Sequence, residues 1–153
     1  MGKGMGGTVA IKLAMERPDL VAKLIVGEGN VTGGGGALVK KVVSVNEAEF
    51  VETIFPRMQA KMFEGAKTGD PIGTRRNNVW QNISPLGLYR NAQMLSTVPD
   101  TLLDDFLALS MPRTFIYGES SRPATPQDTG PDTPWPDQLT VHGVSTETVP
   151  KAG

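Results

Sequence analysis

The chain has 153 residues, enough for one domain with a real core, and 39% apolar against 20% charged residues is a globular composition. It contains no cysteine and one histidine, His142, which excludes disulfides, thiolate metal sites and any site that needs two imidazoles from this chain. The 15 basic and 16 acidic residues nearly balance, which argues against nucleic-acid binding. No apolar run is long enough for a membrane span, and no export signal is visible, so we expect a cytoplasmic protein.

Glycine and proline are frequent, with 18 and 12 copies, and they cluster instead of spreading evenly. Four glycines fall within residues 2–7, four more form the run 33–36, and prolines concentrate in residues 123–136. Periodic segments lie between these clusters. The chain is therefore expected to have structured blocks separated by irregular joints.

The first block predicts a helix followed by a strand. Residues 8–17 carry an apolar stripe at helical spacing, and Pro18 ends that helix. Residues 21–26 form a short apolar run with β-branched members, which is typical of a strand buried on both faces.

The middle of the chain is predicted to be helical. Asn46 is a suitable N-cap, and Gly65 and Gly69 mark the end of the helix that follows it. One face of that helix has an apolar residue at every fourth position: Phe50, Ile54, Met58 and Met62. Further helices are expected over residues 86–95 and 100–109.

The last part predicts two more strands. Residues 113–117 give a second buried strand, residues 120–136 a loop, residues 137–142 a short helix, and residues 144–149 a third strand. Helices that alternate with about three strands predict an α/β fold with a parallel sheet.

Residues 2–7 (GKGMGG) match the pattern G-x-G-x-x-G, and the match has two interpretations. In a dinucleotide-binding unit, Gly2, Gly4 and Gly7 form a turn that approaches a pyrophosphate, and an acidic residue about 20 positions later binds the ribose. Glu28 stands at about that distance. The first interpretation is therefore a dinucleotide-binding fragment.

The second interpretation is a resemblance. Residues 2–7, followed by AMERPDLVAKL at residues 14–24, resemble the nucleophile elbow of α/β-hydrolases. That family typically has Gly-His-Ser-Met-Gly-Gly, a helix that ends in an Arg-Pro-Asp/Glu phrase, and then an apolar strand. The phrase at residues 16–21 (ERPDLV) belongs to no dinucleotide fingerprint, so it favours the hydrolase interpretation.

The resemblance continues along the chain and implies a partial α/β-hydrolase fold with about three parallel core strands, flanking helices and a helical cap insert. Residues 1–36 are similar to the elbow, its helix and the first surviving core strand. Residues 37–111 lie where the family places its cap or lid. Residues 112–153 are similar to the C-terminal core strands and the acid loop, a segment that in the family leads directly to the catalytic histidine.

The resemblance also implies roles for individual residues. Gly4 occupies the nucleophile position, where glycine offers no oxygen to attack an acyl carbon. Met5 would supply a backbone oxyanion donor, Glu119 is the candidate triad acid, and Glu28 is the alternative acid. The family reaction is hydrolysis of a small ester or acyl substrate without cofactor or metal, and we expect the chain as given to be inactive.

A non-catalytic interaction module remains a third possibility. The strand near Leu24 is expected to have an open edge, which predicts self-association. His142 is expected on the surface near a helix C-terminus, Ser120 and Ser121 as turn formers, and residues 33–36 as the joint to the cap.

Overall fold

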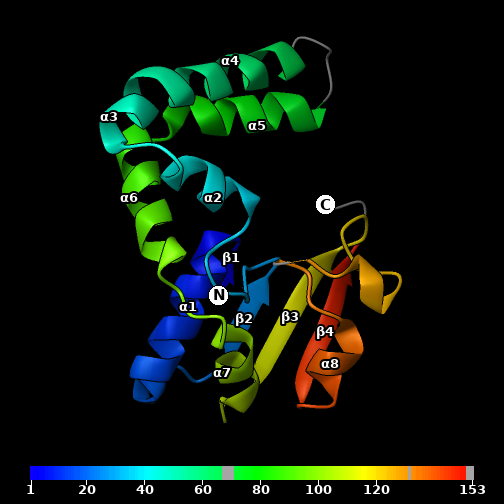
Figure 1. Cartoon of the computed structure of the whole chain (residues 1–153). Helices are drawn as coiled ribbons and strands as arrows, with labels where there is room; N and C mark the ends of the chain where they lie inside the picture. Colours follow the sequence, from blue (N-terminus) through cyan, green and yellow to red (C-terminus); the bar gives the residue numbers. More distant parts are fainter. Residues whose placement is uncertain (67–70, 131, 151–153) are drawn as a thin grey trace. The chain divides into compact units, whose positions relative to one another are not determined.

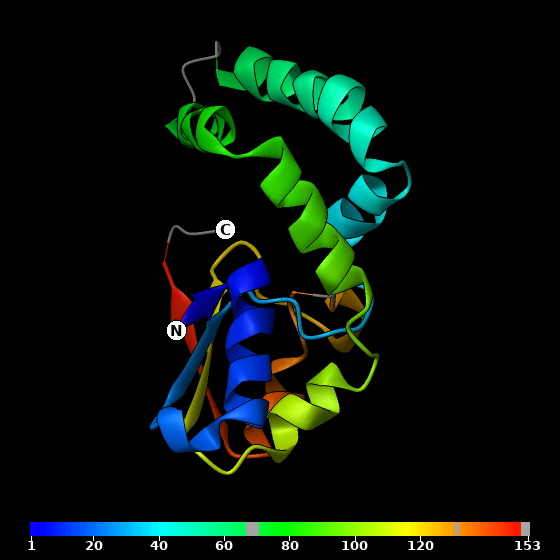
Figure 2. The ribbon, with the colours of Figure 1, turned by 90° about the vertical axis from the view of Figure 1, so that its left-hand side faces the viewer.

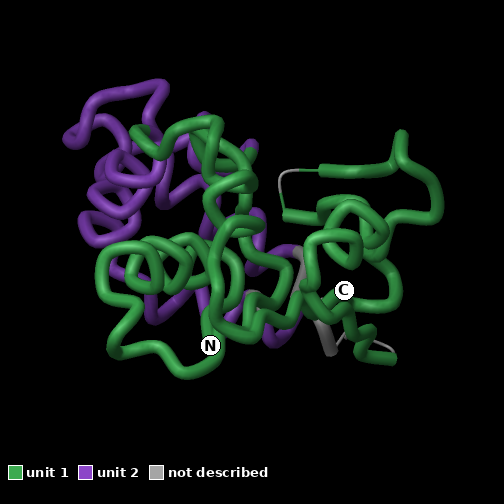
Figure 3. The backbone as a smooth tube through the Cα atoms, turned by 90° about the horizontal axis from the view of Figure 1, so that it is seen from below, with its two compact units in different colours: residues 1–36, 97–153 green, residues 37–96 purple. Residues whose placement is uncertain are grey.

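A computed structural model describes residues 1–66, 71–130 and 132–150 of the chain. The chain forms two compact units, one of residues 1–36 and 97–153 and the other of residues 37–96 (Figure 3). The second unit begins where the helical insert was predicted to begin. It ends at Ser96, so residues 97–111 fold with the first unit.

The first unit is built on a parallel sheet with the strand order β1-β2-β3-β4 (Figure 1). Its strands are β1 (Gly2–Lys3), β2 (Leu24–Gly27), β3 (Arg113–Gly118) and β4 (Val144–Val149). The expected parallel α/β architecture is confirmed, with one strand more than the three expected. The additional strand is β1, which pairs Gly2 with Val26 and Lys3 with Gly27 and is too short to show an apolar pattern.

Helices of the first unit cover one face of the sheet. They are α1 (Met5–Glu16), the 3-10 turn η1 (Pro18–Leu20), α7 (Leu102–Ala108), the 3-10 turn η3 (Pro126–Asp128) and α8 (Pro136–Thr140). Figures 1 and 2 show α1, α7 and α8 on the same side of the sheet.

This one-sided cover divides the strand residues by face. Val26, Phe115 and Tyr117 are fully buried. Ile25 and Ile116 alternate with them along the strands and are only half-buried. The expectation that both strands are buried on both faces is therefore wrong for Ile25 and Ile116 in the described chain, because the helices of this unit lie on the opposite face.

The first helix, α1, begins three residues earlier than predicted because two glycines of the N-terminal cluster are helical. Its buried side consists of Gly7, Thr8, Ile11 and Ala14, which recur at helical spacing. The helix ends at Glu16 because the residue before a proline disfavours helical backbone.

Every regular element described in the second unit is a helix or helical turn. Its elements are α2 (Ala37–Val43), α3 (Glu47–Glu49), the π-helical turn η2 (Phe50–Ile54), α4 (Phe55–Ala66), α5 (Pro71–Asn82) and α6 (Pro85–Ser96). Asn46 is the predicted N-cap, and its side chain accepts a hydrogen bond of 2.9 Å from the Glu49 N–H. Helices α2 and α5 had not been predicted.

The π-helical turn changes which residues face the core of the second unit. The Phe55 N–H bonds to the Phe50 carbonyl, so the turn holds one more residue than an α-helical turn. Phe50 and Phe55 are consequently both buried, with ring centroids 6.1 Å apart. The rest of the predicted stripe is less buried than Phe50: Ile54, Met58 and Met62 are half-buried.

None of the helices in the described residues is both long enough and apolar enough to cross a bilayer.

Candidate functional site

The turn between β1 and α1 has the geometry of a sharp strand-to-helix elbow. Gly4 stands at its apex with φ 54° and ψ −127°. Its N–H donates to the Gly27 carbonyl at 3.2 Å, and its carbonyl accepts from the Gly7 N–H at 2.9 Å. A Cβ atom added at Gly4 would meet nothing within 4 Å, so the elbow leaves open space where a nucleophilic side chain stands in the pattern that the sequence resembles.

Two further glycines of the elbow, Gly2 and Gly7, are required by close packing, whereas Gly6 is not. A Cβ on Gly2 would lie 2.0 Å from the Gly6 carbonyl oxygen. A Cβ on Gly7 would lie 2.8 Å from the Gly29 Cα, and a Cβ on Gly29 would lie 2.5 Å from a methyl group of Val26. The start of α1 therefore lies against the backbone just beyond β2, at a distance that only glycine permits.

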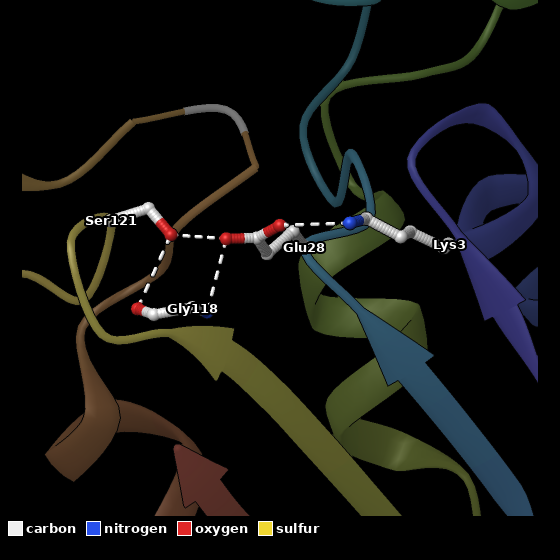
Figure 4. A network of polar contacts seen from close by, with 4 residues as sticks. All are labelled: Lys3, Glu28, Gly118 and Ser121. Carbon is white, nitrogen blue, oxygen red and sulfur yellow. Dashed lines mark hydrogen bonds and ion pairs between the residues drawn. The ribbon is translucent and has the colours of Figure 1, made fainter. Parts of the chain in front are cut away.

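Glu28 lies at the centre of a polar network next to this elbow (Figure 4). It follows β2 directly, and its backbone has φ 43°, the only positive φ of a non-glycine residue in the described chain. Its carboxylate Oε1 accepts a hydrogen bond of 3.0 Å from the Gly118 N–H and another from the Ser121 hydroxyl. Its Oε2 lies 3.4 Å from the Lys3 ammonium.

His142 lies far from this network. The strands are parallel, His142 precedes β4, and Glu28 follows β2, so the two residues stand at opposite ends of the sheet. His142 is exposed just after α8, as expected, and borders a cleft of about 220 Å³. Asp104, Leu107, Ala108 and Gln138 line the rest of that cleft. The one imidazole of the chain is thus not available to the elbow.

Comparison with solved structures identifies the fold of this chain. No family model and no curated protein match the sequence. Among solved structures, the chain is similar to a thermophilic esterase from Thermogutta terrifontis with malate bound, with a TM-score of 0.65 and 19% identity over 99% of this chain and 56% of the esterase. It is also similar to a hydrolase from Pseudomonas aeruginosa, with a TM-score of 0.60 and 16% identity over 97% of this chain and 54% of that one. This chain has part of the α/β-hydrolase fold.

A third similar structure is a putative non-heme bromoperoxidase from Mycobacterium tuberculosis, with a TM-score of 0.56 and 16% identity over 99% of this chain and 57% of that one. The present chain therefore spans little more than half the length of these three structures. Identities this low establish the fold alone, and the chemistry has to be argued from the residues at the elbow.

The carboxylate of Glu28 is held in its charged form. Burial raises its pKa, but hydrogen bonds from Ser121 and Gly118 outweigh that effect. The nearby Lys3 ammonium acts in the same direction, so the pKa of Glu28 lies below its ordinary value. The Lys3 side chain is 74% exposed, so solvent screens its attraction to Oε2 and the ion pair is weak. The other oxygen, Oε1, is fixed by two hydrogen-bond donors.

A second carboxyl group, that of Asp132, is affected by the charge of Glu28. The Asp132 carboxyl lies close to Gly36, where an added Cβ would be 3.9 Å from its Oδ2. Partial desolvation raises the pKa of Asp132, and the negative charge of Glu28 raises it further. Two neighbouring carboxyl groups of this chain, those of Glu28 and Asp132, therefore have pKa shifts of opposite direction.

The structure brings three of the predicted site residues together and places the fourth, Glu119, elsewhere. Gly4, Met5 and Glu28 come together, since Gly4 bonds to Gly27 and Glu28 contacts Lys3. Glu119 is exposed, and its backbone N–H donates to the Val149 carbonyl at 3.1 Å, at the far side of β3.

Ser121 is a member of the network that the sequence did not reveal. It does form a turn as expected, with its N–H on the Gly118 carbonyl at 3.2 Å. Its hydroxyl also donates to Glu28, which lies 93 positions away. The sequence signal for this contact is only that both residues follow strands whose C-terminal ends are neighbours in the sheet.

Among the described residues, no group of three or more histidine and acidic side chains is arranged to hold a metal ion. The arrangement offers instead a fixed carboxylate and the first backbone N–H of α1. Met5 follows the apex and is the first residue of α1, so its N–H has no acceptor inside the helix. A carbonyl oxygen of a ligand above Gly4 is a suitable acceptor for such a donor.

Proposed function

We propose that this chain is a relative of the ester and acyl hydrolases that binds a small acyl or ester compound at its elbow and does not hydrolyse it. The observation that carries the proposal is Gly4 at the apex of the turn, with φ 54°, ψ −127° and open space above it. The backbone has the form of a turn that carries a nucleophile, and glycine has no nucleophilic side chain.

The chemistry of ester hydrolysis explains why we expect no turnover. Ester hydrolysis by this fold needs a hydroxyl that attacks the acyl carbon, an imidazole that moves its proton, and a carboxylate that orients the imidazole. Gly4 has no hydroxyl, and His142 lies at the other end of the sheet. Glu28 and the Met5 N–H remain, and they support binding of a ligand carbonyl without a covalent step.

The proposal is tested by activity and by binding. We expect no turnover of p-nitrophenyl acetate above the buffer rate and no labelling of any serine by a fluorophosphonate probe. Labelling together with turnover would overturn the claim that the chain is inactive. In amide NMR spectra, phenyl acetate at millimolar concentration should shift the Met5 and Gly6 signals, and unchanged signals would overturn the claim that it binds.

A dinucleotide-binding fragment is the second candidate. It is supported by the strand β1, which contains the first glycine of the motif, Gly2, and by Glu28 directly after β2. The hydrogen bonds from Gly118 and Ser121 count against it, because they direct the Glu28 carboxylate toward β3. Isothermal titration with NAD and NADP separates the candidates: micromolar binding that is lost in Gly4→Val would favour the dinucleotide, and absence of heat would exclude it.

A further inference from the structure

The cleft of about 220 Å³ next to His142 lies between α7 and the segment that contains α8, near the end of the sheet where β3 and β4 begin. One wall is a single face of α7, since Asp104, Leu107 and Ala108 are three and four positions apart. The other wall consists of Gln138 in α8 and of His142 just after it. All five residues belong to the first unit, and the proposed function uses none of them.

Both walls of the cleft are fixed by one guanidinium group. Arg113, the first residue of β3, donates from Nη1 to the carbonyls of Phe106, at 2.9 Å, and Leu107 in α7. Its Nη2 donates to the carbonyl of His142 at 2.8 Å. The His142 N–H in turn donates to the Leu139 carbonyl at 3.1 Å. Because one side chain holds a residue of each wall, the cleft is preformed, and a ligand does not have to order it.

The rim of the cleft has a negative charge that no neighbouring side chain neutralises. Asp104 is exposed, and its carboxylate makes no ion pair with another side chain among the described residues. The Arg113 guanidinium is directed at three carbonyl oxygens instead. Gln138 and His142 add an amide oxygen and an imidazole nitrogen as hydrogen-bond acceptors. A ligand with an ammonium group therefore meets an opposite charge and further acceptors.

The remainder of the cleft is apolar and small. Leu107 is only 8% exposed and lines the cleft with the methyl group of Ala108. The flat imidazole of His142 offers a surface on which an aromatic ring can stack. The volume of about 220 Å³ is below the roughly 300–1,000 Å³ of pockets for drug-sized ligands, so the cleft suits a ligand with one ring and a short side chain.

We propose that this cleft binds small aromatic amines, with the ammonium group on the Asp104 carboxylate and the ring between Leu107 and His142. The binding is weak for two reasons. Water screens the charge of the exposed Asp104, and a ligand of this size has little surface to bury. We therefore expect a dissociation constant on the order of 1 to 10 mM.

Titration of the ¹⁵N-labelled chain with 2-phenylethylamine, followed by amide NMR spectra, tests the proposal. We expect the signals of Leu107, Gln138 and His142 to shift and to approach saturation at millimolar concentration. The neutral analogue 2-phenylethanol has the same ring and chain length and should bind at least about threefold more weakly, because it cannot form the ion pair.

Two variants identify the charge that is responsible. Asp104→Asn should weaken binding of the amine at least about threefold and leave binding of the alcohol unchanged. Asp105→Asn is the matched control, because it removes the same charge one position along α7 from a residue that does not line the cleft. It should leave the affinity for the amine unchanged.

Three results would overturn the proposal. The first is the absence of shifts at Leu107, Gln138 and His142 up to about 20 mM amine. The second is an alcohol that binds as tightly as the amine. The third is an equal loss of affinity in Asp104→Asn and Asp105→Asn, because the overall charge of the chain would then be responsible. The comparison of amine with alcohol uses only the wild type, so it decides the proposal even where a variant is unstable.

Discussion

Two adjacent glycines at the start of α1 are expected to respond in opposite ways to the same substitution. In Gly7→Ala the new Cβ lies 2.8 Å from the Gly29 Cα and 3.1 Å from a Val26 methyl group. In Gly6→Ala the new Cβ meets nothing within 4 Å. Both residues are helical, so the two variants differ mainly in the space that the methyl group finds.

The expected magnitudes follow from two effects. Replacing glycine by alanine within a helix stabilises by roughly 0.5–1 kcal/mol, and this gain is common to both variants. Forcing a methyl group into closely packed backbone costs about 1–3 kcal/mol, because a Cα atom cannot move aside as a flexible side chain can. We therefore expect Gly6→Ala to be slightly more stable than the wild type, and Gly7→Ala to be less stable than Gly6→Ala by about 1–3 kcal/mol.

Urea unfolding followed by circular dichroism measures this difference, because a change in midpoint at constant slope is a change in stability. If Gly7→Ala is as stable as Gly6→Ala, the close approach of α1 to the backbone beyond β2 is not present in the protein. The steric explanation for the glycines of the elbow would then be refuted.

Three further predictions concern the site itself. Gly4→Ser and Gly4→Ala should each lose about 1–3 kcal/mol in urea unfolding, because a positive φ strains any side chain even in open space, and Gly4→Ser should still not hydrolyse p-nitrophenyl acetate. Glu28→Gln should lose about 1–2 kcal/mol at pH 7; since the folded pKa of Glu28 is lowered, the wild type's advantage should shrink as the pH falls below about 5, and a constant difference would contradict the assignment. Asp132→Asn should show the opposite sign, because its pKa is raised: the variant gains relative to the wild type as the pH rises through the acid range, which pH-dependent unfolding will detect.

Sequence patterns predicted the regular elements best where apolar spacing is strong. The strand expected over residues 144–149 coincides with β4, and the helix expected over residues 86–95 differs from α6 by one residue at each end. Helix α5 was missed because its sequence is mostly polar and has no continuous apolar stripe. It is held by tertiary contacts with α4, including the stacking of Phe55 on Trp80 at 5.7 Å.

The candidate site was only partly predictable, for a different reason. The glycines at residues 2–7 identified the elbow, because a tight turn leaves a local signature. The choice between Glu28 and Glu119 had no local signature, since each carboxylate follows a strand. The choice depends on which residues of one strand end reach the next strand end, and the contacts of Glu28 with Gly118 and Ser121 span 90 and 93 positions.

The contacts of the elbow explain why this turn forms with glycine at its apex. Its backbone is fixed by the hydrogen bond from Gly4 to Gly27 and by the close approach of Gly7 to Gly29, and neither contact involves a side chain at the apex. Replacing a serine by glycine at such a position removes the strain of a positive φ and leaves every one of these contacts in place. The backbone of the elbow therefore does not depend on the side chain at its apex, which is what the proposed function requires: Gly4 offers no hydroxyl, while the Glu28 carboxylate and the Met5 N–H are held by other parts of the chain.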